Sequence, residues 1–237
     1  MGNGRLGPVD AVVFDLGGVL VRLTGLDELT RLSGHSREEI VRRWLGCRWV
    51  RRFESGRCPP DEFAAGVVAD WGLPLSADAF LDSFVTWPEA LFDGAVEIVT
   101  ETAGVATVAC LSNTNALHWE VHARRWELDA LFDELFLSHL MGMVKPDAAV
   151  FDHVVDVLGR PAPRILLLDD SPPNVEAARN AGLRAKVVRG PVEARRVLAE
   201  LGVLDDSRTF SDDDGAPRGD GPGPGRPPTG REQAGGD

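Results

Sequence analysis

The chain has 237 residues, a hydrophobic fraction of 43%, a charged fraction of 26% and a formal net charge of −12. This composition is that of an ordinary folded protein, and the acidic charge argues against nucleic-acid binding, because phosphate backbones require a basic face. No apolar run approaches the ~18 residues that a membrane span requires, and the N-terminal residues contain no apolar signal segment. We therefore expect a cytoplasmic protein that binds neither nucleic acid nor membranes.

The first strand is predicted at residues 11–14, an apolar and partly β-branched run that ends at Asp15. Three similar runs follow at 105–111, 164–169 and 183–188, and a weaker one at 134–137. Stretches that can form helices follow three of them, at about 116–126, 173–181 and 192–201. Runs of this kind indicate strands that are buried on both faces. Their alternation with helices predicts an α/β protein with a doubly wound parallel sheet.

Residues 23–92 differ, because they contain helical patterns and no convincing strand. Ser36 with Glu39 three residues later matches a helix capping box, and Pro60 and Ser76 mark two further helix starts. Four tryptophans lie in this stretch, and core packing is their simplest role. We therefore predict an inserted helical cap at 23–92, between the two pieces of the core at 1–22 and 93–204.

The last residues, 205–237, contain almost no apolar side chains after Phe210 and are rich in Gly, Pro and Asp. Such a segment cannot bury enough surface to offset its ordering entropy. We expect this tail to be disordered.

Cys47, Cys58 and Cys110 are odd in number and form no Cys-x-x-Cys pair, so we expect reduced thiols and neither disulfides nor a zinc site. Of the 25 basic residues, only Lys145 and Lys186 are lysines. A lysine at a given position is therefore the exception in this chain, which favours a specific role for Lys145.

Four segments with polar side chains lie at or near the ends of predicted elements, where ligands bind in open α/β sheets. They are 14–18, 111–115, 144–146 and 168–171. Together they supply the carboxylate of Asp15, the hydroxyl of Ser112, the ammonium of Lys145 and the carboxylate pair Asp169-Asp170. This set matches the needs of phosphoryl transfer, in which a carboxylate attacks an anionic phosphate and the repulsion must be neutralised.

Mg²⁺ prefers one or two carboxylates, carbonyl oxygens and substrate phosphate as ligands. We predict that Asp15, the backbone carbonyl of Gly17 and Asp170 bind Mg²⁺, with Asp169 and Asn174 in support. A surface or capping role is the simpler alternative for each carboxylate.

The phosphoryl group itself requires donors. Ser112 and the backbone N–H groups that follow it, beginning with Asn113, are predicted to hold the phosphoryl oxygens at a helix start. Lys145 is predicted to contact both the phosphoryl group and the nucleophile, Asp15, against the alternative of a solvated loop lysine.

The order and spacing of these segments resemble the haloacid dehalogenase-like (HAD) superfamily, in the branch with a helical cap after the first strand. The sequences LSNTNALH, GMVKP and LLLDDSPPN are similar to those of bacterial α-D-glucose-1-phosphate phosphatases. The resemblance covers residues 10–190 and implies a phosphatase that acts on a sugar phosphate through an aspartyl-phosphate intermediate.

One position departs from most phosphatases of that superfamily, in which an aspartate two residues after the nucleophile acts as acid and base. Here that residue is Gly17. The glucose-1-phosphatase-like branch resembles this sequence in having glycine at that position. A substrate with an easier leaving group, such as a sugar-1-phosphate or an acyl phosphate, would need less help. A cap group or His118 is a possible substitute.

Several other readings stay open. Glu54 and Arg57 in the cap are either substrate contacts or, more simply, solvated residues, and His118 with His122 has the spacing of a metal pair but no third ligand. A 2-haloacid dehalogenase uses the same nucleophile without a metal, and a phosphomutase would need the acid that Gly17 lacks. A non-catalytic protein that retains a phosphate pocket is the alternative of another class.

Overall fold

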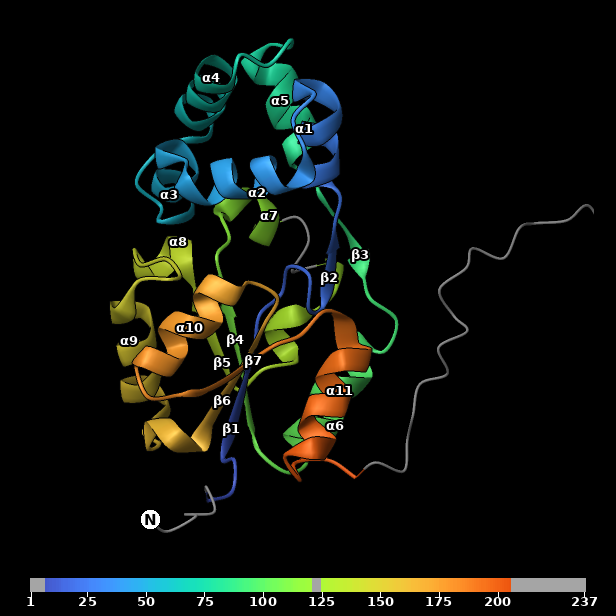
Figure 1. Ribbon diagram of the computed structural model, residues 1–237, viewed down its shortest axis with the longest axis vertical. Coiled ribbons are helices and arrows are strands. Elements are labelled where there is room, and N and C mark those ends of the chain that lie inside the picture. Colours follow the sequence, from blue (N-terminus) through green and yellow to red (C-terminus); the bar gives the residue numbers. More distant parts are fainter. Residues whose placement is uncertain (1–6, 121–124, 206–237) are drawn as a thin grey trace, which may run out of the picture.

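A five-stranded sheet forms the centre of the computed structural model, which describes residues 7–120 and 125–205 (Figure 1). The strands are β1 (Ala11–Phe14), β4 (Thr107–Ser112), β5 (Glu134–Leu137), β6 (Ile165–Asp169) and β7 (Arg184–Val187). Their order is β5-β4-β1-β6-β7, and every neighbouring pair is parallel. All five predicted strands are confirmed, within two residues at either end, and the α/β class is correct.

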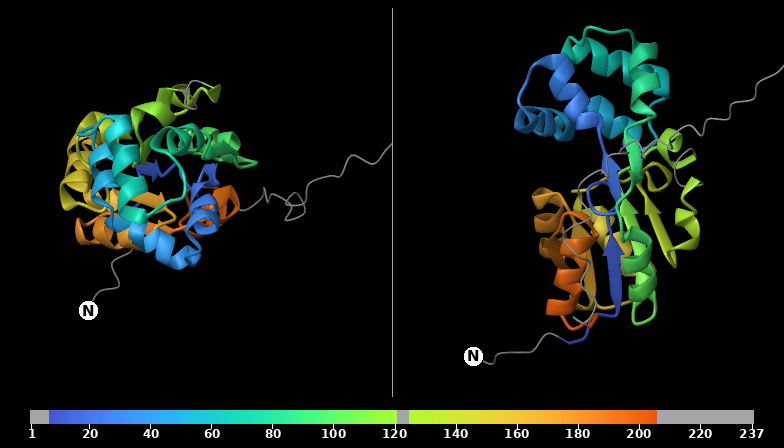
Figure 2. Two further views of the ribbon diagram at one scale, coloured as in Figure 1. Left: turned by 90° about the horizontal axis from the view of Figure 1, so that it is seen from above. Right: turned by 90° about the vertical axis from the view of Figure 1, so that its right-hand side faces the viewer.

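Helices cover both faces of the sheet, as Figures 1 and 2 show. Successive side chains of β1 point to opposite faces of the sheet. On one face, Val12 and Phe14 pack with α6 (Ala95–Ala103) and α11 (Gly190–Glu200). Ala11 and Val13 pack instead with α9 (Ala148–Leu158) and α10 (Pro172–Asn180). All four residues of β1 have an exposed fraction of 0%. Burial on both faces is why these strands read as continuous apolar runs rather than as alternating ones.

A separate helical unit lies beyond the carboxyl ends of the strands (Figure 1). It consists of α1 (Gly25–Ser33), α2 (Arg37–Gly46), α3 (Arg48–Glu54), α4 (Pro60–Trp71) and α5 (Ala77–Phe84). The unit has its own hydrophobic core, in which the ring of Phe63 stacks on that of Phe53 with centroids 4.3 Å apart. Tryptophans belong to this core, as predicted.

The starts of three helices follow the predicted signals. Ser36 caps α2 with a complete capping box, in which its hydroxyl accepts from the N–H of Glu39 and the Glu39 carboxylate accepts from the N–H of Ser36. Ser76 caps α5, and Pro60 is the first residue of α4. The local sequence therefore determines where these helices begin.

Two short strands connect the helical unit to the core. β2 (Val21–Leu23) pairs antiparallel with β3 (Pro88–Leu91), and they form a ribbon along which the chain leaves and re-enters the sheet layer (Figure 1). The expectation that residues 23–92 contain no strand is wrong for β3. The sequence Pro-Glu-Ala-Leu has little intrinsic strand preference, and its hydrogen-bonded pairing with β2 stabilises the extended conformation instead.

The remaining elements are short: α7 (Ala116–His118), η2 (Leu128–Ala130), α8 (Ser138–Met141) and η3 (Ala162–Arg164). The helix predicted at 116–126 begins as α7 and then reaches residues 121–124, which lie outside the described residues, as does His122. The predicted tail also lies outside them from residue 206 onward.

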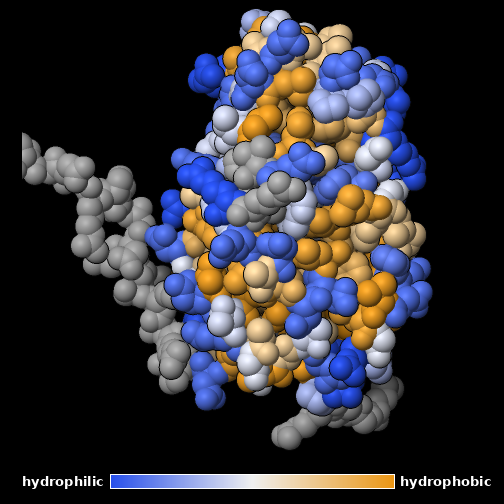
Figure 3. Space-filling view, turned by 180° about the vertical axis from the view of Figure 1, so that it is seen from behind, coloured by the Kyte–Doolittle hydropathy of each residue, from blue (hydrophilic) through white to orange (hydrophobic). Residues whose placement is uncertain are grey.

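The described surface mixes apolar and polar side chains over both the helical unit and the sheet layer, as Figure 3 shows from behind. None of the described helices has the length and apolar character needed to cross a membrane. The three cysteines are free and buried.

The core of the helical unit depends on Phe63, which contacts Phe53, Phe80, Phe84 and Trp44 in the aromatic cluster. We expect Phe63→Ala to lower the free energy of unfolding by about 3–5 kcal/mol, because it leaves a cavity among rings that cannot close up. Urea denaturation followed by tryptophan fluorescence measures the change. Phe63→Leu, which keeps most of the volume, should cost less than half as much; equal losses would contradict the packing argument.

Candidate active site

Three adjacent strands bring the predicted residues together. Asp15 directly follows β1, Ser112 ends β4 and Asp169 ends β6, and β1 lies between the other two strands. Lys145 reaches the same edge from the loop between α8 and α9. All four are buried, with exposed fractions of 8% or less. Because parallel strands end at one edge of a sheet, residues far apart in the sequence form one site.

The Lys145 ammonium lies at the centre of this group. Its Nζ donates to Asp169 Oδ2 at 2.7 Å and to the Leu111 carbonyl at 2.8 Å, and it lies 2.9 Å from Asp15 Oδ1. Burial lowers the pKa of Lys145, but the carboxylates of Asp15 and Asp169 outweigh burial and raise that pKa above its ordinary value. Lys145 is therefore a charged residue with all three donors engaged, and a solvated loop position is excluded.

Asp15 presents its two carboxylate oxygens differently. Oδ1 accepts from the Leu16 N–H at 2.7 Å and contacts Lys145, whereas no described residue donates to Oδ2. Burial raises the pKa of Asp15, Lys145 opposes this rise, and Asp169 and Asp170 add to it. One oxygen is thus fixed by the protein and the other is available to a ligand or an electrophile.

Both carboxylate oxygens of Asp169 accept hydrogen bonds from other residues of the protein. Oδ1 accepts from the N–H of Ser171 at 2.9 Å and from Asn174 Nδ2 at 3.0 Å, while Oδ2 accepts from Lys145. These bonds orient Asp169 as the partner of Lys145. The predicted support of a metal by Asp169 and Asn174 stays a prediction.

Asp170, the next residue, is different, because no described side chain donates a hydrogen bond to its carboxylate. Burial raises the pKa of Asp170 to about 6, and the neighbouring Asp169 adds to the rise. The backbone at Gly18 passes very close: a Cβ on Gly18, whose φ is +74°, would lie 2.4 Å from Asp170 Oδ2. Glycine at this position lets the loop after β1 approach a carboxylate that has no side-chain donor among the described residues.

A divalent cation fits this arrangement. Oxygen atoms of Asp15, Asp169 and Asp170 lie within 4.8 Å of one another, and two of these carboxylates retain an oxygen without a donor among the described residues. A buried cluster of carboxylates with unsatisfied oxygens is unfavourable unless protons or a cation neutralise it. Hard oxygen ligands favour Mg²⁺ over softer metals.

The segment after β4 supports Lys145. Asn113 Nδ2 donates to the Lys145 carbonyl at 3.0 Å and Asn113 Oδ1 accepts from the Lys145 N–H at 2.8 Å. Its side-chain amide therefore fixes the Lys145 backbone, a role that the sequence analysis missed. The Thr114 N–H donates to Ser138, and α7 begins at Ala116, where the helix was predicted to start. No described residue bonds to the Ser112 hydroxyl.

A cavity of about 1020 Å³ joins the site to the helical unit. Asp15, Ser112, Lys145 and Asp170 line one end. The rest of the lining combines charged residues with aromatic rings from both parts of the chain: Trp44, Phe84, Trp87, Trp119 and Trp126. The cavity is large enough for an organic molecule of drug-like size attached to a phosphate.

His118 lines the same cavity but is engaged by the protein. Nε2 lies 2.7 Å from the Phe84 carbonyl, Nδ1 lies 3.2 Å from Asn115 Nδ2, and the ring stacks on Phe84. A neutral ring that donates from Nε2 and accepts at Nδ1 satisfies both contacts. His118 therefore anchors α5 to the core and is a poor substitute for the acid absent at Gly17.

Glu54, at the end of α3, also lines the cavity, together with Lys145. Glu54 is half-buried and faces the cavity, which does not match the simpler reading of a residue on a solvated face. Burial raises its pKa to about 7, with Lys145 opposing the rise. Sequence spacing gave no signal that this end of α3 faces the strand ends.

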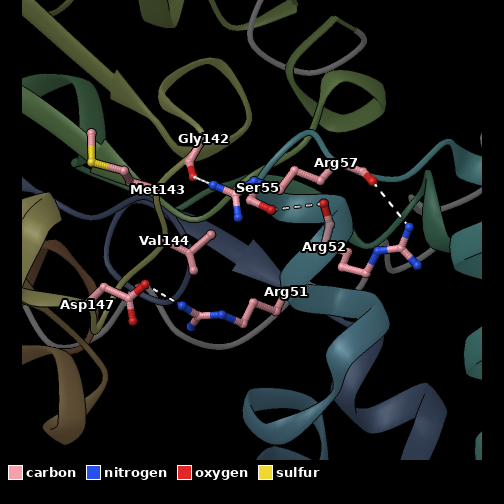
Figure 4. Close-up of a pocket in the computed structure, with 8 residues that line it drawn as sticks. All are labelled: Arg51, Arg52, Ser55, Arg57, Gly142, Met143, Val144 and Asp147. Carbon is pink, nitrogen blue, oxygen red and sulfur yellow. Dashed lines mark hydrogen bonds and ion pairs between the residues drawn. The ribbon is translucent and has the colours of Figure 1, made fainter.

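Two arginines join α3 and the turn after it to the loop that carries Lys145, around a smaller cavity of about 210 Å³ (Figure 4). Arg51 forms an ion pair with Asp147, and Arg57 Nη2 donates to the Gly142 carbonyl at 2.9 Å. Arg57 thus contacts the protein, and these two contacts hold the helical unit against the core.

The comparison with protein-family models identifies the class. The model of haloacid dehalogenase-like hydrolases matches residues 9–182. The chain belongs to this family. The match includes β1, β4 and β6 and every predicted site residue, so the resemblance seen in the sequence is confirmed at the level of the superfamily, while a specific likeness to glucose-1-phosphate phosphatases is not shown.

Relatives of this HAD-like hydrolase include two named phosphatases. Phosphatase MT3486 of Mycobacterium tuberculosis is 28% identical over 214 residues, which cover 83% of this chain and 96% of that protein. The sesquiterpene phosphatase AstK of Aspergillus oryzae is 31% identical over 179 residues, which cover 73% and 86% respectively. A HAD family enzyme of Bacteroides thetaiotaomicron, solved with magnesium and inorganic phosphate, shares the fold at a TM-score of 0.64 and 20% identity, over 80% of this chain and 98% of that one.

The chain's two lysines permit a matched test of the buried charge. We expect Lys145→Met to lower the free energy of unfolding by about 3–5 kcal/mol, because it leaves Asp15 and Asp169 buried without their counter-ion. Lys186→Met makes the same change at an exposed position and should lie within about 0.5 kcal/mol of the unmodified protein. Urea denaturation without added metal measures both. Equal stability of the two variants would show that the carboxylates do not depend on Lys145.

Proposed function

We propose that this hydrolase is a Mg²⁺-dependent phosphatase that hydrolyses a small phosphorylated metabolite, with Asp15 as the nucleophile. The observation that carries the proposal is the position of Lys145. It pairs with Asp15 and Asp169 together, while Asp15 Oδ2 has no donor and Asp170 has no side-chain donor among the described residues. Two relatives named as phosphatases, and the Bacteroides enzyme solved with magnesium and inorganic phosphate, support the same reading.

In this scheme Asp15, the Gly17 carbonyl and Asp170 hold Mg²⁺, which neutralises charge on the phosphoryl oxygens when bound. Asp15 attacks phosphorus, the P–O bond to the organic group breaks, and an aspartyl-phosphate forms. Water then attacks the phosphorus and releases Asp15. Ser112 and the Asn113 backbone hold the phosphoryl oxygens, and Lys145 contacts a phosphoryl oxygen by exchanging one of its three protein partners.

The helical unit acts as the cap in this proposal, with the domain bounds 23–92 for the cap and 1–22 with 93–204 for the core. The cap covers the carboxyl ends of the strands, excludes water from the phosphoryl group and selects the organic part of the substrate. The β2–β3 ribbon is the natural place for cap movement, because it is the covalent connection between the two parts.

Two substrate classes are compatible with the site. A sugar-1-phosphate suits the absence of an acid at Gly17 and the resemblance in the sequence. A phosphate on an apolar organic group suits the aromatic rings in the cavity lining, and the relative named as a sesquiterpene phosphatase favours this class.

Replacement of the nucleophile tests the reaction. We expect Asp15→Asn to lower phosphate release by at least about a thousandfold, because an amide oxygen cannot form the aspartyl-phosphate. Removing Mg²⁺ with EDTA should abolish release, and added Mg²⁺ should restore it. Asp82→Asn, an exposed change in α5, should retain full activity.

Release that survives Asp15→Asn would contradict the scheme. Metal-independent release of halide from 2-haloacids would instead establish a dehalogenase, and phosphate binding without turnover of any ester would establish a binding protein.

A panel of phosphomonoesters tests the substrate class. Sugar-1-phosphates, an acyl phosphate, and alkyl and isoprenoid monophosphates of increasing length would be compared by kcat/KM. If the rings of Trp44 and Trp87 bind the organic group, kcat/KM should rise with alkyl length by about threefold to fourfold per buried methylene, from about 0.8 kcal/mol each. A flat dependence on length together with a preference for sugar-1-phosphates would favour the sugar substrate.

A further inference from the structure

The proposed reaction lacks an obvious proton source. An alkoxide leaving group needs a proton as the P–O bond breaks, and the water that attacks the aspartyl-phosphate must lose one. Gly17 has no side chain, and Leu23 fills the space beside it: a Cβ on Gly17 would lie 2.7 Å from Leu23 Cδ1. An acid for an ordinary alkoxide leaving group would therefore come from another part of the cavity.

Glu54 occupies a suitable place. Its carboxyl lines the cavity that also contains Asp15 and Lys145, and no described residue forms a hydrogen bond or ion pair with it. Burial raises its pKa to about 7, and the charged group that acts on it is Lys145, which lies against the nucleophile. A carboxyl that titrates near neutrality can donate a proton in one step and accept one in the next.

The position of Glu54 is fixed by its neighbours in the chain. Arg51, one turn earlier on α3, binds Asp147, and Arg57, just after the helix, binds the Gly142 carbonyl (Figure 4). Asp147 and Gly142 lie on either side of Lys145 in the sequence. These two contacts therefore hold the end of α3 against the loop that carries Lys145, with Glu54 between the anchors.

The other titratable groups of the cavity are less suitable. His118 has both ring nitrogens engaged, and Asp15 and Asp170 belong to the proposed nucleophile and metal site. Glu38, on α2, is exposed to solvent. The four arginines that line the cavity, Arg37, Arg42, Arg51 and Arg189, do not release protons near neutral pH.

We propose that Glu54 is the general acid and base of the reaction and replaces the side chain absent at Gly17. As Asp15 Oδ bonds to phosphorus and the ester P–O bond breaks, the Glu54 carboxylic acid gives its proton to the leaving oxygen. The resulting carboxylate then takes a proton from water as that water bonds to phosphorus and the Asp15–phosphorus bond breaks. The inference rests on the proposed phosphatase function.

Two esters separate the acid step from the base step. 4-Nitrophenolate leaves without needing a proton, whereas an alkoxide needs one. For Glu54→Gln we expect kcat with an alkyl phosphate to fall by about 10²–10⁴-fold. With 4-nitrophenyl phosphate the first turnover should keep its rate and later turnovers should slow, giving a burst of nitrophenolate approaching one per site. Glu62→Gln is the matched control, since Glu62 pairs with Arg52 on the exposed side of the cap.

The pH dependence provides a second readout. With the alkyl ester, kcat should decrease as the pH rises through about 7, because the acid form of Glu54 is required. With the nitrophenyl ester, kcat should increase through the same range, because the base form is required. Both limbs should disappear in Glu54→Gln and remain in Glu62→Gln, and Glu54→Asp should restore part of the activity and both limbs.

Equal losses with the two esters and no burst would overturn the inference, because they indicate a packing or binding role. Activity of Glu54→Gln within twofold of the unmodified protein would overturn it as well, as would weaker Mg²⁺ binding measured by calorimetry. If Glu54→Gln fails to fold, the kcat–pH profiles of the unmodified protein decide: profiles without opposite slopes for the two esters near pH 7 would contradict the role of Glu54. In each case, loss of turnover in Asp15→Asn would still support the proposed phosphatase function. Turnover that Asp15→Asn leaves unchanged would contradict both the phosphatase function and the role of Glu54.

Discussion

The buried ammonium of Lys145 is the interaction on which the site depends. Removing a charged lysine and two carboxylates from water is expensive, and the cost is offset only when every donor and acceptor has a good partner. Lys145 meets this condition, because its three donors reach Asp15, Asp169 and the Leu111 carbonyl. Even beside that charge, burial and the neighbouring carboxylates of Asp169 and Asp170 raise the pKa of Asp15 to about 8, so a bound cation would be needed to keep Asp15 ionised at neutral pH.

The ion pairs of Lys145 with Asp15 and Asp169 also connect segments that are distant in the sequence. Asn113 fixes the backbone of Lys145 through two hydrogen bonds, and Asn174 and the Ser171 N–H fix Asp169. The ends of β1, β4 and β6 and the loop after α8 are therefore held in one arrangement before a ligand arrives. Such preorganisation lowers the reorganisation needed when charge develops in a reaction.

The sequence predicted most of this core because its signals are local. Apolar runs gave the strands, and polar residues at their ends gave Asp15, Ser112 and Asp169-Asp170. The rarity of lysine singled out Lys145. What it missed depends on contacts between distant segments: β3 exists because it pairs with β2, and Asn113 turns its amide to Lys145 rather than to a ligand.

Glu54 shows the same limit for the helical unit. Helical spacing tells which residues share a side of α3, but α3 is short and its orientation is set by Arg51 and Arg57, whose partners lie some 90 residues away. Both partners lie on the loop that carries Lys145, so the contacts that seat the helical unit also bring Glu54 to the ion group. If the nucleophile comes from the sheet and the proton from α3, the reaction proceeds only while the two parts are in contact. Closure of the helical unit and the chemistry are then coupled through one loop, residues 142–147.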